Sequence, residues 1–203
     1  MTEGIVRITY FVHGTTVDNE RGISSGWCDC ELSEKGKAQS KALPGQVGDA
    51  SFDVVFSSDL KRAVDSARIS FKGVAPLRKD KRLRECNYGN LNGGASVKVD
   101  EMMRGCIDKP FPYGESYREV EMRIRGFLGD LCEKYVGKHV GIVAHRAPQL
   151  ALDVILKGMM WEQAMDADWR LRKEWRPGWE YMLDCAALKG PAESGKAKEG
   201  KPR

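Results

Sequence analysis

The sequence predicts an α/β protein, a three-layer α/β/α sandwich with a mostly parallel central sheet. Short apolar segments rich in β-branched residues alternate with longer segments whose apolar residues recur at helical spacing. Three of the short segments end directly at His13, Ser57 and His145. Ligands of parallel sheets bind beyond the carboxyl ends of the strands, so these three residues can share one site. The length of 203 residues suits one domain.

Four segments are predicted to be strands, at residues 4–12, 52–56, 140–144 and 180–187. The first three are short and mostly apolar, which is typical of buried strands. Residues 83–94 are rich in Gly and Asn and are predicted to be a loop.

Four helices are predicted from apolar spacing and from start signals. One begins after Ser33, whose side chain can cap a helix N-terminus, and the others cover residues 60–71, 116–135 and 148–156. In residues 60–71 and 116–135 the apolar residues recur at helical spacing. Strands and helices therefore alternate along the chain, which favours a parallel sheet.

Composition and charge exclude several classes of protein. No apolar run is long enough to span a membrane, and residues 1–4 lack the features of a signal peptide, so we expect a cytoplasmic location and no membrane partner. Much of the net charge of +4 comes from residues 189–203, a Lys-rich stretch that is predicted to be a disordered basic tail. Residues 1–188 form the predicted domain. They are near neutral, so no nucleic-acid partner is expected.

The six Cys are expected to be structural or surface thiols. Cys28 and Cys30 are separated by one residue and the others are scattered, whereas zinc sites use tight groups of Cys and His. Only three His are present, and none is near Cys28, so no metal site is expected. His139 follows a predicted turn and is expected to be exposed.

Six segments, in order along the chain, resemble the motifs of the histidine phosphatase superfamily, whose fold is called phosphoglycerate-mutase-like. Residues 12–19 (VHGTTVDN) are similar to the family motif Arg-His-Gly-x-Thr-x-x-Asn. The other segments are residues 29–39, 57–63, 83–93, 114–116 and 143–145. The resemblance implies a phosphoglycerate-mutase-like sandwich and a histidine phosphatase-like catalytic domain over residues 1–188.

The resemblance implies four catalytic residues. His13 would be the nucleophile: one ring nitrogen would attack phosphorus, while a backbone carbonyl holds the other and fixes the tautomer. Arg62, in the first turn of a helix, would bind the phosphate through its forked donors. His145 would add positive charge beside the phosphoryl oxygens. Glu85 would protonate the leaving oxygen and then activate water.

Substrate contacts are also expected, at Gly14, Asn19, Ser25, Gly26, Tyr88 and Arg146. Glu101 and Glu115 lie in predicted loops that could approach the same site, so they remain alternatives to Glu85. No metal or cofactor is expected, because side chains supply the positive charge that phosphoryl transfer needs. Most of the Trp residues near the end of the chain are expected to pack the C-terminal segment, and one could line the substrate entrance: Trp161, Trp169, Trp175 and Trp179.

Two positions depart from the family pattern. Val12 stands where the motif has an Arg that grips the phosphate, and Arg146 stands where a Gly usually follows the second His. A charge-assisted hydrogen bond contributes about 1.5–3 kcal/mol, so the loss of a bidentate Arg could lower the rate by several powers of ten. Our hypothesis is that Arg146 reaches into the space left by Val12. The alternative is that Arg146 points to solvent.

The sequence therefore predicts a phosphomonoesterase that hydrolyses a small phosphorylated metabolite through a phosphohistidine on His13. One alternative is a phosphoglycerate-mutase-type phosphotransferase, although the short interval at residues 94–113 favours an open site and hydrolysis. A second is a catalytically impaired phosphate-binding protein, which would explain Val12 but would need neither a nucleophile nor an acid. Residues 86–108 and 159–177 are expected to set specificity. The substrate is not predicted, and a homodimer remains open.

Overall fold

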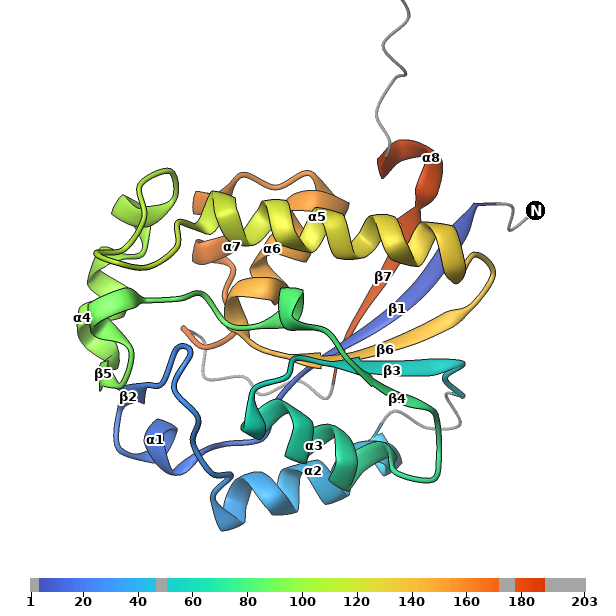
Figure 1. Ribbon diagram of the computed structural model, residues 1–203, viewed down its shortest axis with the longest axis horizontal. Helices are drawn as coiled ribbons and strands as arrows, with labels where there is room; N and C mark the ends of the chain where they lie inside the picture. The colour runs from blue at the N-terminus through green and yellow to red at the C-terminus, as the bar shows by residue number, and fades with distance from the viewer. Residues whose placement is uncertain (1–3, 47–50, 172–177, 189–203) are drawn as a thin grey trace, which may run out of the picture.

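The central sheet of the computed structural model has five strands, four of which run parallel (Figure 1). The structure describes residues 4–46, 51–171 and 178–188. The fifth strand, β7 (Trp179–Asp184), runs antiparallel to its neighbour β1 (Ile5–Val12). The prediction of a mostly parallel sheet is confirmed. Across the sheet the strands lie in the order β4 (Leu77–Lys79), β3 (Val54–Ser57), β6 (His139–Ala144), β1 (Ile5–Val12) and β7 (Trp179–Asp184).

The middle strands are covered on both faces. Every residue of β3 and β6 is buried, which explains why their sequences are nearly continuous apolar runs rather than alternating ones. In register, Val12 lies opposite Ala144, and Ser57 lies opposite Val143. Strands β1, β3 and β6 therefore end side by side, and the residues that follow them are brought to one edge of the sheet.

Helices cover both faces of the sheet, which confirms the three predicted layers (Figure 1). One face carries α2 (Glu34–Gln46) and α3 (Lys61–Phe71), and the other carries α5 (Tyr117–Lys134), α6 (Arg146–Lys157) and α7 (Trp161–Asp166). The larger core cluster includes residues of β1, β6, α5 and α6, and the smaller one includes residues of β1, β3, α2 and α3.

The predicted helix starts agree with the structure to within about two residues. Ser33 directly precedes α2, and its Oγ accepts a hydrogen bond from the N–H of Gly36. Ser116 caps α5 and forms a capping box with Glu119. α6 begins at Arg146, two residues before the predicted start, so it follows β6 almost at once.

Several short elements lie beyond the carboxyl ends of the parallel strands (Figure 1). The strands β2 and β5 pair antiparallel with each other. The sequence predicted none of these elements, although residues 83–94 are mostly loop, as expected. The elements are α1 (Val17–Glu20), β2 (Ile23–Ser24), β5 (Gly94–Ala95) and α4 (Ser96–Met102), with 3₁₀ turns at Lys81–Leu83, Gly89–Leu91 and Arg104–Cys106.

The last predicted strand is too long. β7 ends at Asp184, because the Oδ1 of Asp184 accepts hydrogen bonds from the N–H groups of Ala186 and Ala187 and starts a helical turn. The short helix α8 (Cys185–Leu188) follows. Cys185 forms a disulfide with Cys132 of α5, so the expectation of thiols is wrong for this pair.

His139 is buried, and the prediction of an exposed residue is wrong. It is the first residue of β6, and its ring bonds to Oγ1 of Thr9 and to the carbonyl oxygen of Ser51. In the described ranges, no helix combines the length and the apolar character needed to cross a membrane. The predicted tail, residues 189–203, lies outside the described residues, and the domain boundary at residue 188 stays a prediction.

Candidate active site

A cavity of about 150 Å³ lies at the carboxyl edge of the parallel strands. Its lining comes from segments that are far apart in the sequence, among them the end of β1, the first turns of α3 and α6, and the start of β7. Arg62, Arg146 and Arg170 line it together with Glu85. A cavity lined by several guanidinium groups suits an anionic ligand.

His13 is held in a single neutral form. Its Nδ1 lies 2.8 Å from the carbonyl oxygen of Gly14, which can only accept, so Nδ1 carries the proton. Its Nε2 lies 3.2 Å from Nε of Arg62, which can only donate, so Nε2 presents a lone pair. Burial and the charge of Arg62 lower the pKa of His13 to about 3. The imidazole is therefore neutral at pH 7, and Nε2 has the lone pair that a nucleophile requires.

Arg62 is placed by the first turn of α3 and by two backbone carbonyl groups. Its Nη1 donates to the carbonyl oxygen of Cys28 over 3.0 Å, and its Nη2 donates to that of Gly26 over 2.7 Å. The side chain is only 2% exposed. Carbonyl acceptors orient a guanidinium without neutralising it, so Arg62 keeps its full charge beside the nucleophile.

His145 lies next to His13 and is fully buried. The centroids of the two rings are 5.0 Å apart. Nε2 of His145 lies 2.7 Å from Oγ of Ser58, and Nδ1 has no hydrogen-bond partner among the described residues. Burial, followed by the charge of Arg62, holds the pKa of His145 well below its usual range. The ring is therefore neutral in the free site, and a bound anion would have to raise its pKa before it carries charge.

The carboxyl group of Glu85 lies at the N-terminus of α6. Its Oε1 accepts from the N–H groups of Cys86 and Ala147, each over 2.9 Å. Its Oε2 accepts from the N–H of Arg146 over 3.2 Å. The side chain lines the cavity and has a fixed orientation, which a group that exchanges a proton with a bound substrate needs.

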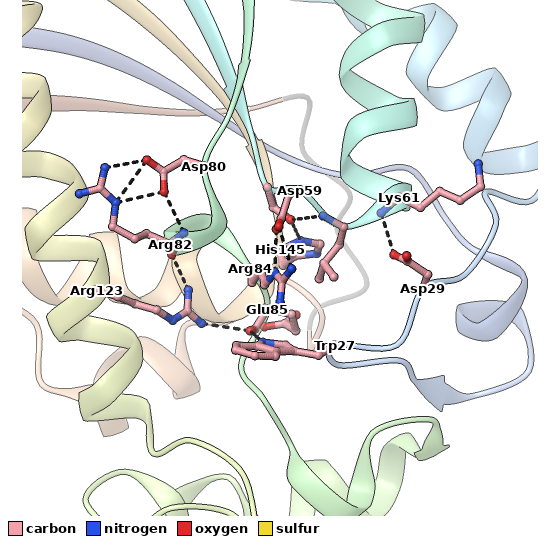
Figure 2. Close-up of polar contacts among 12 residues, drawn as sticks. Trp27, Asp29, Asp59, Lys61, Asp80, Arg82, Arg84, Glu85, Arg123 and His145 are labelled. Carbon is pink, nitrogen blue, oxygen red and sulfur yellow. Dashed lines mark hydrogen bonds and ion pairs between the residues drawn. The ribbon is translucent and has the colours of Figure 1, made fainter.

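A polar network that the sequence did not predict holds the backbone of Glu85 (Figure 2). The carbonyl oxygen of Glu85 accepts from Nε1 of Trp27 over 2.7 Å and from Nη2 of Arg123 over 3.0 Å. Arg84 makes two hydrogen bonds of 2.7 Å to the carboxylate of Asp59, and its guanidinium lies 4.8 Å from the ring centre of Trp27. The Arg84 guanidinium holds the pKa of Asp59 below its usual value. Asp59 and Arg84 have opposite charges and lie in two of the motif segments, 57–63 and 83–93. That was the one signal in the sequence that could have predicted this ion pair.

Glu85 is the one of the three candidate acids that lines the cavity. Glu115 is engaged elsewhere, because it forms an ion pair with Arg123 and accepts from the N–H of Asn87. Glu101 is exposed on α4. The geometry therefore favours Glu85 over both alternatives.

Five of the six predicted substrate-binding residues line the cavity. The polar groups of Asn19 and Ser25 already have partners within the protein. Oδ1 of Asn19 accepts from the N–H of Thr16, which leaves the amide NH₂ group for a ligand, and the Ser25 hydroxyl donates to Asp18. The five are Asn19, Ser25, Gly26, Tyr88 and Arg146.

Two of the predicted Gly residues occupy positions where a side chain does not fit. A Cβ atom on Gly14 would lie 2.4 Å from the carbonyl oxygen of Gly36, at the start of α2. Gly26 has a φ of +54°, and a Cβ atom there would lie 1.8 Å from Oδ1 of Asn92. Gly14 does not line this cavity, so it serves the site through its carbonyl oxygen, which orients His13.

Arg146 is buried and paired, and it lines the same cavity as Val12. Its Nε donates to the carboxylate of Asp168, and its Nη1 donates to that of Asp100 over 2.6 Å. The residue is 9% exposed, so the alternative that it points to solvent is wrong. Two carboxylates offset its single charge. That Arg146 replaces the motif Arg stays a prediction.

One wall of the cavity comes from residues near the C-terminal end of the described chain, two of them in the stretch 159–177 that was expected to set specificity. Trp169, Arg170 and Trp179 line it, and the two indole rings are 6.0 Å apart. Trp161, by contrast, is fully buried in the core, and Trp175 lies outside the described residues. Sequence reasoning also missed three polar residues of the lining, Thr15, Ser24 and Gln39.

Comparisons with known proteins agree with this fold. The model of the Histidine phosphatase superfamily (branch 1) matches residues 10–172. Phosphoserine phosphatase 1 of Hydrogenobacter thermophilus is 29% identical over 164 residues, which are 76% of this chain and 78% of that protein. The 2,3-bisphosphoglycerate-dependent phosphoglycerate mutase 2 of Gloeobacter violaceus is 30% identical over 148 residues, 66% of this chain and 67% of that protein.

Among solved structures, a mycobacterial glucosyl-3-phosphoglycerate phosphatase in complex with VO₃ has a similar fold. The TM-score is 0.72 at 27% sequence identity, and the match covers 80% of this chain and 87% of that one. These relatives are phosphatases and a mutase, enzymes that transfer phosphoryl groups. From the family match over most of its length, the chain belongs to the histidine phosphatase superfamily.

Proposed function

We propose that the protein is a phosphomonoesterase that hydrolyses a small phosphorylated metabolite through a phosphohistidine on His13. The observation that carries this proposal is the state of His13. Its Nδ1 is bonded to the carbonyl oxygen of Gly14, and its Nε2 lone pair faces the guanidinium of Arg62. An unprotonated nucleophile beside a fixed positive charge is what phosphoryl transfer through a covalent intermediate requires.

In the first step, Nε2 of His13 attacks phosphorus and the bond to the leaving oxygen breaks. The proposal requires Glu85 to hold a proton at this moment and to give it to the leaving oxygen. The Nε–H of Arg62 has to leave Nε2, because that lone pair now forms the bond to phosphorus. It then donates to a phosphoryl oxygen instead.

In the second step, Glu85 takes a proton from water, and the water oxygen attacks phosphorus. The bond between phosphorus and Nε2 breaks, so His13 regains its lone pair and inorganic phosphate leaves. Nδ1 of His145 lies next to His13 and has no hydrogen-bond partner within the described ranges, so a phosphoryl oxygen could become its partner.

We propose hydrolysis rather than isomerisation because the segment between the motifs at residues 83–93 and 114–116 is short, which favours an open site. Residues 94–113 are short and contain β5, α4 and a 3₁₀ turn. The comparisons include both a phosphatase and a mutase, so the two activities need a direct test. Isomerisation of 3-phosphoglycerate with bisphosphoglycerate present should be slower than phosphate release from the best ester in a metabolite screen. The reverse order of rates would make the protein a mutase.

A phosphate-binding protein without turnover is the second candidate, and Val12 is the observation that favours it. An apolar side chain lines the cavity where the family motif has an Arg. The two candidates differ in phosphate release from p-nitrophenyl phosphate. We expect turnover by the wild type and a loss of about a thousandfold in His13→Ala. His139→Gln, a change to a histidine outside the cavity, is the matched control.

A cytoplasmic location is part of the same proposal, because small phosphorylated metabolites are charged and are retained inside cells. The disulfide between Cys132 and Cys185 provides its test, since disulfides are rare in a reducing cytoplasm. Alkylation of free thiols in intact cells should find this pair reduced. A fully oxidised pair would argue for an oxidising compartment.

A further inference from the structure

Beside His13, the cavity lacks one positively charged side chain that the family motif supplies. Val12 lines the cavity directly before His13, where that motif has an Arg. Among the residues that the structure describes, three Arg line the same cavity: Arg62, Arg146 and Arg170. Arg62 already has its own motif position, so in residues 4–46, 51–171 and 178–188 the candidates to replace the missing group are Arg146 and Arg170.

Arg146 is excluded by its partners. Its guanidinium donates to Asp168, which is 2% exposed, and to Asp100. Breaking a buried ion pair leaves an uncompensated buried charge, so Arg146 cannot turn to a ligand without a large loss of stability. Its positive charge is also offset by those two carboxylates, which weakens its attraction for a phosphate.

Arg170 has the properties that Arg146 lacks. It lines the cavity together with His13 and Val12, and it is exposed. In the described part of the chain its guanidinium forms no ion pair. Its charge also acts at the nucleophile, because Arg170 is one of the groups that lower the pKa of His13. Arg170 therefore has a positive charge within electrostatic reach of the site of phosphoryl transfer.

Asp168, the ion-pair partner of Arg146, also fixes the turn that contains Arg170. Oδ1 of Asp168 accepts from the N–H of Arg170 over 3.0 Å, and the carbonyl oxygen of Asp168 accepts from the N–H of Leu171 over 3.1 Å. The other oxygen of the Asp168 carboxylate accepts from Nε of Arg146. A continuous chain of hydrogen bonds thus runs from the first residue of α6 to the backbone of Arg170.

We propose that Arg170 supplies the guanidinium that Val12 lacks and binds the phosphoryl group held at His13, and that Arg146 is a positioning residue that acts through Asp168. This inference rests on the proposed function. The two departures from the family motif are then linked: one removes a phosphate ligand, and the other fixes the turn that replaces it. A ligand from an exposed turn can approach and leave with the substrate, whereas a motif Arg is fixed at the strand end.

Binding of inorganic vanadate tests the proposal without requiring turnover, because vanadate resembles a phosphoryl group and has no leaving group. Isothermal titration calorimetry should find Arg170→Gln weaker than the wild type by about ten- to a hundredfold, the effect of one charge-assisted hydrogen bond. Arg170→Lys should bind with an intermediate affinity. Arg78→Gln, at an exposed Arg of β4, is the control and should bind as the wild type does. Unchanged affinity in Arg170→Gln overturns the proposal and leaves Arg170 as a contact for the leaving group.

A second comparison tests whether Arg170 takes the place of the motif residue. Val12→Arg should raise vanadate affinity more in the Arg170→Gln background than in the wild type, because one phosphoryl group has room for only one of the two. Equal effects in the two backgrounds, including no effect in both, overturn the replacement.

The role of Asp168 is tested by non-additivity. Asp168→Asn should weaken vanadate binding in the wild type but should have no further effect in Arg170→Gln. A general structural role of Asp168 would weaken binding equally in both backgrounds and would overturn the positioning role. Asp168→Asn combined with Arg146→Gln removes both charges of the buried pair and serves if the single variant does not fold. If the wild type binds vanadate but hydrolyses no ester, the proposed function fails while this inference keeps its own test.

Discussion

Nε of Arg62 lies 3.2 Å from Nε2 of His13, so the free site pairs its fixed guanidinium with its own nucleophile. This hydrogen bond keeps Nε2 unprotonated and aims the ring, but it occupies the lone pair that has to attack phosphorus. Substrate binding must therefore exchange one acceptor for another: phosphoryl oxygens replace Nε2 as partners of Arg62. The bonds from Arg62 to the carbonyl oxygens of Gly26 and Cys28 hold the guanidinium in place during that exchange.

This arrangement predicts that Arg62→Lys loses activity although it keeps the charge. A Lys side chain lacks the planar fork and cannot serve His13 and the two carbonyl groups together, so kcat should fall by about ten- to a hundredfold. Initial rates with p-nitrophenyl phosphate measure the effect. Arg68→Lys, an exposed Arg on the same helix, should leave kcat unchanged. A wild-type kcat in Arg62→Lys would contradict the role of the fork.

The stability of the protein should fall as the pH decreases from about 6.5 towards 3. The pKa of an unfolded histidine is about 6.5, whereas that of His13 is about 3 in the fold, so in this window the unfolded chain binds a proton that the folded protein does not. His13 contributes at most about 2 kcal/mol of this loss between pH 6.5 and 5, at about 1.36 kcal/mol per pH unit. The lowered pKa of His145 acts in the same direction.

Urea denaturation of the wild type and of His13→Gln at pH 7 and pH 5 measures this contribution. The free energy of unfolding should drop less in the variant, because it has lost one group that is kept neutral by the fold. An equal drop in both proteins would show that His13 is not held neutral.

Glu85→Gln should lower kcat most for esters with poor leaving groups. An alkyl phosphate needs a proton on its leaving oxygen, whereas p-nitrophenolate leaves without one, so the ratio of wild-type to variant kcat should be larger for the alkyl ester. The loss for the alkyl ester is expected to be about a hundredfold or more. Glu101→Gln, at an exposed position on α4, is the control. Equal losses for both esters would remove Glu85 from the role of acid.

The disulfide should stabilise the C-terminal end of the fold. It joins α5 to α8 across a sequence separation of 53 residues, and closing a loop of that length in the unfolded chain corresponds to about 4 kcal/mol. Cys132→Ser should therefore unfold at a lower urea concentration than the wild type, with Cys28→Ser, at an exposed free thiol, as the control. Addition of dithiothreitol should bring the wild type to the stability of Cys132→Ser and leave that variant unchanged. No effect of either treatment would mean that the bond is absent in solution.

The sheet and the strand-end histidines could be predicted because their signals are local. β1 and β6 are short apolar runs, and His13 and His145 follow them directly, so the rule for ligands of parallel sheets brings them to one edge. The prediction for His139 failed because burial at the start of β6 depends on partners from distant segments, such as Thr9. A turn signal before a residue does not report what packs on it.

The sequence indicated residues 159–177 and one Trp near the entrance, but the wall that Trp169, Arg170 and Trp179 form together could not be predicted, because it also depends on distant segments. Trp179 is placed by the antiparallel register of β7 with β1, where it lies opposite Tyr10. The position of Arg146 depends on two carboxylates from other segments. Local sequence encodes neither the register nor those pairings. The sequence therefore offered Arg146 as a possible substitute for the motif Arg, whereas the substitute proposed from the cavity lining is Arg170.

Trapping the covalent intermediate would reveal whether turnover passes through a phosphohistidine on His13. The protein is mixed with a phosphorylated substrate labelled at phosphorus, quenched in alkali within one turnover, digested and analysed by mass spectrometry. Phosphate should be found on His13, should be stable in alkali and labile in acid, and should be absent from His13→Ala. Turnover without any phosphate on His13, or an equal rate in His13→Ala, would contradict the account.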